Sequence, residues 1–195
     1  MIPENLHWAF EQGHRVSTLA GTGKTIQHRL ADLILPSGQI STGYPGDNLV
    51  NEPNKVQTQV APGTYPVFLQ IVRNTGAGTF AFAAIRFSET KTITWKSAGR
   101  FFTDRGDGCI FDTTLITLLK KKRSQMEQEE WAQLKTAALY DGDGNLVLDE
   151  STGANAIIFK TGDWSYNCFV GHDQDDQIAC LVIDGRIQHS HKNPF

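Results

Sequence analysis

The chain has 195 residues, of which 39% are hydrophobic and 20% charged, a composition typical of one globular domain with a substantial core. Its 21 acidic and 18 basic side chains leave a net charge of −3, which excludes the strong counterion-release attraction that nonspecific nucleic-acid binding requires. The first residues contain neither a basic nor a continuous apolar segment, and no stretch reaches the ~20 apolar residues of a membrane span. We therefore expect a cytoplasmic protein with no membrane or nucleic-acid partner.

The first half of the chain is expected to be largely β. Turns are predicted at residues 21–24 and 36–38, because glycine, proline and serine cluster there. The glycines of the connector at 74–78 can adopt the positive φ angles of a hairpin loop, so the strands on either side of it should pair. The predicted strands are residues 15–19, 27–35, 64–72 and 79–87.

A helical pair is expected at residues 113–140. Lysines and an arginine at 120–123 end the first helix and glutamates follow, as the two helix dipoles prefer, which favours a solvated corner over a nucleic-acid contact. Ser124 and Glu127 have the spacing of a capping box, so the second helix is predicted to begin at Ser124. Its expected buried face is Met126, Trp131, Leu134 and Ala138.

Further strands are predicted at residues 156–160, 166–170 and 177–184, the last two forming a closing hairpin. Strands, then helices, then strands again, without regular βαβ alternation, predict a single α+β domain over residues 1–195. Its main element is an antiparallel sheet, arranged as a sandwich or a half-barrel, with a central helical pair. Residues 189–195 are expected to be a mobile tail, in which His189 and His191 are more consistent with solvent exposure than with a metal site.

Aspartates next to glycines are the strongest candidates for chemistry. Asp104, Asp107 and Asp112, joined in space by Asp163, could hold a divalent cation and activate water, as in a metal-dependent hydrolase. The same residue types also form tight turns through bonds between side chain and backbone. The enzymatic hypothesis requires the four carboxylates to meet in one cleft.

Two other motifs are favoured as turns. Asp141, Asp143 and Asn145 resemble the start of an EF-hand calcium loop, but leucine and threonine occupy the positions of its glycine and its bidentate glutamate. Residues 20–25 resemble the end of a phosphate-binding loop, but its first glycine is missing and the following segment has strand character rather than helix character.

The 3 cysteines are too far apart for a metal knuckle and are expected to be reduced, buried thiols. Cys109 is the only one in a suggestive setting. The carboxylates near it would raise its pKa and weaken it as a nucleophile, so a structural role is favoured.

Three motifs together resemble one bacterial family. They are Gly63-Thr64-Tyr65-Pro66-Val67, the segment from Asp104 to Asp112 (Asp-Arg-Gly-Asp-Gly-Cys-Ile-Phe-Asp), and Gly162-Asp163-Trp164-Ser165-Tyr166 with Gly171-His172-Asp173. This pattern, over about residues 35–184, is similar to the domain-of-unknown-function family numbered 4241.

The resemblance implies a small bacterial cytoplasmic protein without an assigned reaction, and some domains of that kind are immunity or accessory proteins that act beside toxins. We therefore expect a non-enzymatic protein-binding module without a cofactor, whose partner is a toxin, with a metal-dependent hydrolase that uses a divalent cation as the alternative. A third alternative is a structural role with self-association into a homo-oligomer. The binding hypothesis predicts an exposed apolar or aromatic patch with a polar rim. Its candidate residues, within the motifs, are Tyr65, Trp164, Tyr166 and Asp173.

Overall fold

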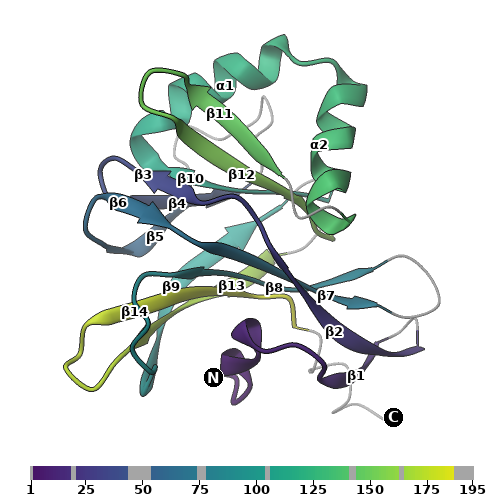
Figure 1. Cartoon of the computed structure of the whole chain (residues 1–195), viewed down its shortest axis with the longest axis vertical. Helices are drawn as coiled ribbons and strands as arrows, with labels where there is room; N and C mark the ends of the chain where they lie inside the picture. The colour runs from purple at the N-terminus through teal and green to yellow at the C-terminus, as the bar shows by residue number, and fades with distance from the viewer. Residues whose placement is uncertain are drawn as a thin grey trace.

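The fold is a sandwich of two antiparallel sheets with two helices on one outer side (Figure 1). The computed structural model describes residues 2–18, 21–43, 54–73, 78–103, 106–140, 144–162 and 165–186. The helical elements are η1 (Leu6–Phe10), η2 (Thr113–Leu115), α1 (Ile116–Gln125) and α2 (Gln128–Tyr140), η1 and η2 being 3₁₀ helices. The strands are β1 (Arg15–Thr18), β2 (Gly21–Arg29), β3 (Leu33–Leu35), β4 (Gln39–Gly43), β5 (Asn54–Gln59), β6 (Gly63–Tyr65), β7 (Val67–Arg73), β8 (Thr79–Arg86), β9 (Thr94–Phe102), β10 (Asp107–Asp112), β11 (Asn145–Asp149), β12 (Ala154–Lys160), β13 (Ser165–His172) and β14 (Ile178–Asp184).

Three groups of strands are hydrogen-bonded within the described residues. The large sheet has the order β1-β2-β7-β8-β14-β13-β9, the small sheet has the order β11-β12-β10-β4-β5, and β3 pairs with β6 in a two-stranded ribbon. Every pairing is antiparallel. The α+β class with mainly antiparallel, sandwich-like sheets is therefore confirmed.

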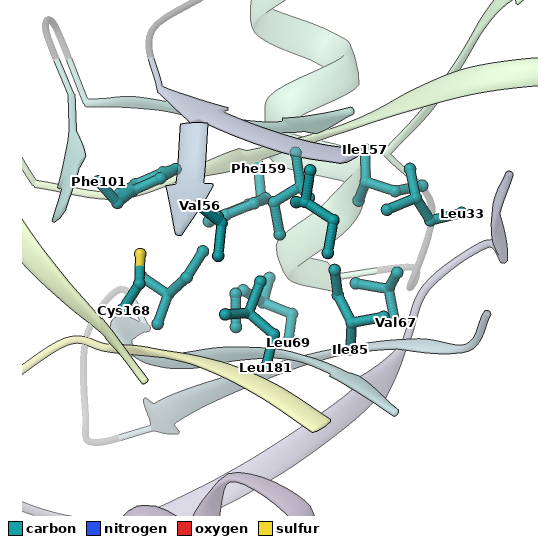
Figure 2. Close-up of a cluster of buried hydrophobic side chains, with 14 of the residues drawn as sticks. Leu33, Val56, Val67, Leu69, Ile85, Phe101, Ile157, Phe159, Cys168 and Leu181 are labelled. Carbon is teal, nitrogen blue, oxygen red and sulfur yellow. The ribbon is translucent and has the colours of Figure 1, made fainter. Parts of the chain in front are cut away.

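The main core lies between the two sheets. Figure 2 shows side chains of both sheets pointing toward one another there, with Leu69, Ile85 and Leu181 facing Phe159 and Ile157. Alternating residues of each strand fill this space because successive side chains of a strand point to opposite faces.

Each sheet also has its outer face covered by helical segments. Helices α1 and α2 pack Leu119 and Trp131 against Cys109, Phe111 and Ile158 of the small sheet. On the other side of the molecule, η1 packs against the outer face of the large sheet (Figure 1). Strand β8 is therefore buried at six successive positions, whereas the edge strand β9 is mostly exposed. Within the described residues, no helix is long and apolar enough to cross a membrane.

Several predicted elements are confirmed. The strands flanking the 74–78 connector form the β7–β8 hairpin, and β13 and β14 form the closing hairpin. The basic run ends α1 and glutamates begin α2, as expected for a helical corner. Of the expected buried face of α2, Trp131 and Ala138 are buried and the others partly buried.

Three predicted boundaries are wrong. Residues 21–24 belong to β2, because they pair with β1 instead of forming a turn. The segment 27–35 is divided between β2 and β3, and the segment 64–72 is divided at Pro66 between β6 and β7. Proline has no N–H to donate, so the chain changes partner there, from β3 to β8 and β2.

The capping box at Ser124 is also wrong. Ser124 lies inside α1 and its hydroxyl donates to the Lys121 carbonyl at 2.8 Å. The break between the helices comes two residues later, where Met126 has an extended backbone. Residues 189–195, with His189 and His191, lie outside the described residues.

Candidate functional site

The aspartates of β10 are separated by the strand itself. Asp107 begins β10 and Asp112 ends it, so at about 3.3 Å per residue they lie about 17 Å apart. The structure thus does not bring these two candidates together, and Asp104 and Asp163 lie outside the described residues. Within the described residues, no group of three or more His, Cys, Asp or Glu side chains is placed to hold a metal ion.

Asp107 joins the small sheet to α2. Its carboxylate accepts a hydrogen bond of 2.8 Å from Trp131 Nε1 and forms an ion pair with Lys135. The guanidinium of Arg123 lies 4.8 Å from the centre of the Trp131 ring on the same helical layer. A buried carboxylate with two donors from one helix anchors that helix, and this arrangement gives Asp107 a structural role.

Asp112 fixes the corner between β10 and η2. Its fully buried carboxylate accepts from the backbone N–H groups of Ser37 at 2.8 Å and Thr114 at 2.9 Å, and from both hydroxyls. It is therefore the N-cap of η2 and also holds the turn after β3. Four donors hold the carboxylate at this corner, and this arrangement gives Asp112 a structural role.

The thiols are buried, as predicted. Burial, and then the charge of Asp107, raise the pKa of Cys109 well above its usual value. Burial also raises the pKa of Cys168 to about 12 and raises that of Cys180. A neutral, buried thiol is a poor nucleophile, so Cys109 has the structural role expected of it.

The flanks of two family-like motifs meet beside Asp107. The Thr103 hydroxyl donates to the Gly162 carbonyl at 2.6 Å, and the Thr161 N–H donates to the Gly106 carbonyl at 2.8 Å. The residues on both sides of Asp104 are thus bonded to residues that precede Asp163. The enzymatic hypothesis placed the two motifs in one site, and their described flanks are hydrogen-bonded to each other.

The candidate binding residues have separate environments. Tyr166 is only 5% exposed, lies in the core between the sheets and bonds Gly162 through its hydroxyl, so its ring is not available to a partner. Tyr65 packs edge-on against Phe87 and donates to the Ala61 carbonyl at 2.7 Å. Trp164 lies outside the described residues.

Asp173 shapes the turn between β13 and β14. One carboxylate oxygen accepts from the N–H groups of Asp175 and Gln177, at 3.0 and 2.9 Å. These bonds hold the pKa of Asp173 below its usual value, with the Gln177 amide the largest cause. Asp173 is therefore a turn residue that also presents negative charge at the surface.

Asn145, a weak metal candidate, lies in β11, and its side-chain oxygen accepts from Asn155 at 2.7 Å. That bond ties β11 to β12 and occupies one of the oxygen atoms that a calcium loop would need. Asp141 and Asp143 lie outside the described residues. The residues 21–25 of the phosphate-loop resemblance lie in β2, which is followed by β3 and not by a helix.

A row of residues that begins just before the edge strand β9 and follows the outer side of that strand was not predicted. Phe101 and Ala98 point into the core between the sheets, while Trp95 packs against the cluster on the outer face of the large sheet. Phe102, next to Phe101, is 46% exposed, and Ile93, two residues before Trp95, is 56% exposed. We call Ile93, Trp95, Ser97, Arg100 and Phe102 the β9 row.

A bulge explains why this row is hidden in the sequence. The pairing with β13 slips between Ser97 and Arg100, where β9 has one residue more than its partner, and Gly99 has a φ of +106°. Side chains of a strand normally alternate between its two faces, and the extra residue shifts this alternation by one position. Trp95 and Phe102 therefore lie on the same face of the sheet although they are an odd number of positions apart. Strict alternation, the signal used for strands, could not find this row.

The end of the β9 row near Ile93 adjoins an acidic turn. The Ile93 N–H donates to the His172 carbonyl at 2.7 Å, and the next residues of that strand lead into the turn of Asp173, Asp175 and Asp176. Asp176 pairs with Lys96 of β9 at 2.9 Å, and this bond is the largest cause that lowers the pKa of Asp176. The exposed apolar residue therefore has charged and polar neighbours.

Comparison with known proteins identifies a family but no reaction. A family model described as a protein of unknown function (DUF4241) matches residues 33–183, which is the span from β3 to β14. This match confirms the family resemblance of the three motifs. No curated protein and no solved structure matches the chain.

Proposed function

We propose that this chain, which belongs to the DUF4241 family, is a non-enzymatic protein-binding module that binds its partner through the β9 row. The observation that carries the proposal is the exposure of Ile93, immediately before the edge strand β9, and of Phe102, at the end of that strand. Large apolar side chains, a tryptophan and an arginine are the residue types that contribute most to binding energy at protein interfaces.

The shape of β9 favours contact through side chains. A bulge and a charged lysine are features by which proteins discourage the pairing of an edge strand with another strand. The partner should therefore rest on the outer face of β9 and not extend the sheet. Phe102 lies nine positions after Ile93, about 30 Å of extended chain, which matches the width of an ordinary protein interface.

The class of partner that we propose is a toxin, with this protein as its immunity or accessory protein in the cytoplasm. Three free, buried thiols are typical of a reducing compartment. The net charge of −3 and the acidic turn next to Ile93 would attract a basic protein surface. Charge would then speed association, while Phe102, Trp95 and Ile93 would supply most of the affinity.

The test is capture of the partner from the source cells, followed by binding measurements with purified proteins. Phe102→Ser and Ile93→Ser are expected to weaken the complex about 30-fold or more each, as for interface residues worth ~2 kcal/mol. Leu118→Ser is the matched control, because Leu118 is 38% exposed but lies on α1, across the molecule from the large sheet (Figure 1). Equal weakening by the control, or no weakening by either β9 variant, would refute the proposal.

The alternative is a metal-dependent hydrolase, and one observation favours it: the flanks of Asp104 and Asp163 are bonded to each other beside Asp107. The test is calorimetric titration with Mg²⁺, Mn²⁺ and Ca²⁺. If a cation binds at this junction, Asp163→Asn should abolish the heat and Asp112→Asn, about 17 Å from Asp107, should leave it unchanged. Absence of binding in the unsubstituted protein would remove this alternative.

A further inference from the structure

The N-terminal segment covers the apolar outer face of the large sheet. Leu6 and Ala9 of η1 are fully buried there against residues of β7, β8 and β14. We call residues 2–12 the N-terminal cover; Figure 1 shows it on the side of the large sheet that faces away from the small sheet. The family match begins at residue 33, so the cover lies outside the part that defines the family.

Side chains of the sheet hold the cover by its carbonyl groups. Gln70 donates to the carbonyls of Trp8 and Glu11, and Gln27 donates to the carbonyl of Ala9 at 3.1 Å. No residue of η1 pairs with a strand, and a 3₁₀ helix of five residues has little stability of its own. Phe10 also packs against Phe68 and lies under the Arg86 guanidinium. The cover is thus held by side-chain contacts and not by a backbone ladder.

One of these contacts is incomplete. Gln70 is fully buried, and its side-chain oxygen has no hydrogen-bond partner among the described residues. Turning the amide over would place that oxygen against two carbonyl oxygens, so the observed orientation is the favourable one. A buried acceptor without a donor costs free energy, and removal of the cover would let solvent or a partner donate to it.

The cover ends where the backbone becomes anchored to β2. Gly13 has a φ of +91°, a conformation that favours glycine, and no atom lies within 4 Å of the place where a side chain would begin. The Gly13 N–H donates to the Thr25 carbonyl of β2 at 2.8 Å, and the His14 carbonyl accepts from the Thr25 N–H at 2.9 Å. The backbone is therefore anchored to the sheet from Gly13 onward, and the residues before Gly13 can move while β1 and β2 stay in the sheet.

The cover and the β9 row meet on the same face. Trp95, in the middle of the row, packs against the cluster that contains Leu6, Ala9 and Phe169. Departure of the cover would extend the exposed apolar surface from β9 across β13, β14 and β8.

From this geometry we propose that the N-terminal cover is a displaceable lid whose opening enlarges the surface next to the β9 row. A role of the lid in regulating partner binding rests on the proposed function. The opening of the lid independently of the rest of the fold does not, because it is a property of this chain alone.

The test measures alkylation of the three cysteines by iodoacetamide in the native protein, resolved by mass spectrometry. Cys180 belongs to the cluster under the cover, Cys168 lies in the core between the sheets, and Cys109 lies under the helices. If the lid opens alone, Cys180 should react at least about tenfold faster than the other two, because local opening needs less free energy than unfolding. Urea at low concentration should change the rate of Cys180 alkylation little, because local opening exposes little surface.

Two variants assign the opening to the cover. Leu6→Ala should raise the Cys180 rate about 30-fold or more, the factor that corresponds to the ~2 kcal/mol lower limit for truncating a buried leucine. Ile157→Val, in the core between the sheets, should raise the rates of Cys109 and Cys168 and leave that of Cys180 unchanged.

Equal rates and equal urea dependence at all three cysteines would overturn the proposal, since the cover would then open only on global unfolding. An unchanged Cys180 rate in Leu6→Ala would also overturn it, because another motion would expose the thiol. No partner is present in this assay, so its failure would leave the proposed binding function standing, and failure of the capture experiment would leave this result standing.

Discussion

Replacement of Asp112 by alanine should destabilise the fold strongly. The carboxylate is fully buried and accepts from two backbone N–H groups, those of Ser37 and Thr114. Alanine would leave both donors without their partner at a partly buried corner, at ~1–3 kcal/mol each, while the desolvation of the carboxylate would be relieved. We expect a loss of about 3 kcal/mol in the free energy of unfolding.

The assay is urea unfolding at pH 7, followed by circular dichroism, with the midpoint and the slope both measured. Asp149→Ala is the matched control, because Asp149 makes the same kind of bonds to Ser151 and Thr152, but in an exposed turn. Water can replace its bonds, so this variant should stay close to the unsubstituted protein. A loss below ~1 kcal/mol for Asp112→Ala, or equal losses for the two variants, would refute the assignment of Asp112 as a buried cap.

Three further predictions follow from other buried positions. Lys135→Met should lower the free energy of unfolding, measured with urea, by about 3 kcal/mol, because it leaves the Asp107 carboxylate buried without its cation. The double variant Lys135→Met with Asp107→Asn should recover most of that loss. Additive losses in the two single variants would contradict the ion pair. Gly38→Ala should cost about 2–4 kcal/mol in the same assay, because φ is +73° and a Cβ would come within 2.0 Å of the Val60 carbonyl oxygen; a neutral effect would place the turn elsewhere. The folded-state pKa of Cys168 is raised to about 12, so its contribution to stability is complete below the pKa of the unfolded thiol, near 9. This contribution should be lost as the pH rises from there toward 12. If the free energy of unfolding falls as steeply with pH in Cys168→Ala as in the unsubstituted protein, the burial of this thiol is contradicted.

The elements that sequence patterns predicted correctly are those with local causes. The β7–β8 and β13–β14 hairpins combine β-rich segments with short connectors, and the helical corner follows from the placement of opposite charges at two helix ends. The buried, unreactive character of Cys109 was also predictable, because free cysteine is usually apolar in behaviour and carboxylates lay near it in the chain. The family match rests on the same local motifs.

Where patterns failed, the pairing of the folded chain changed the local outcome. Gly21 is a good turn residue, yet it is extended because it pairs with Thr18 of β1. The predicted strand 64–72 is divided at Pro66, where β6 bonds the distant β3 and β7 bonds β8. The capping box at Ser124 has correct spacing, but the chain leaves the helix at Met126. A local rule cannot include contacts that form only when the chain has folded.

The amino-acid sequence by itself determined the class of the fold, the family and the residue types available for a site. Tertiary structure alone decided which of these residues share a surface. Asp107 and Asp112, five positions apart, are held at opposite ends of β10 because an extended strand keeps them apart. The residues that flank Asp104 and Asp163, by contrast, bond to each other because β9 pairs with β13. The β9 row depends on one extra residue in a bulge, which the pairing with β13 creates and which no periodicity in the sequence reveals.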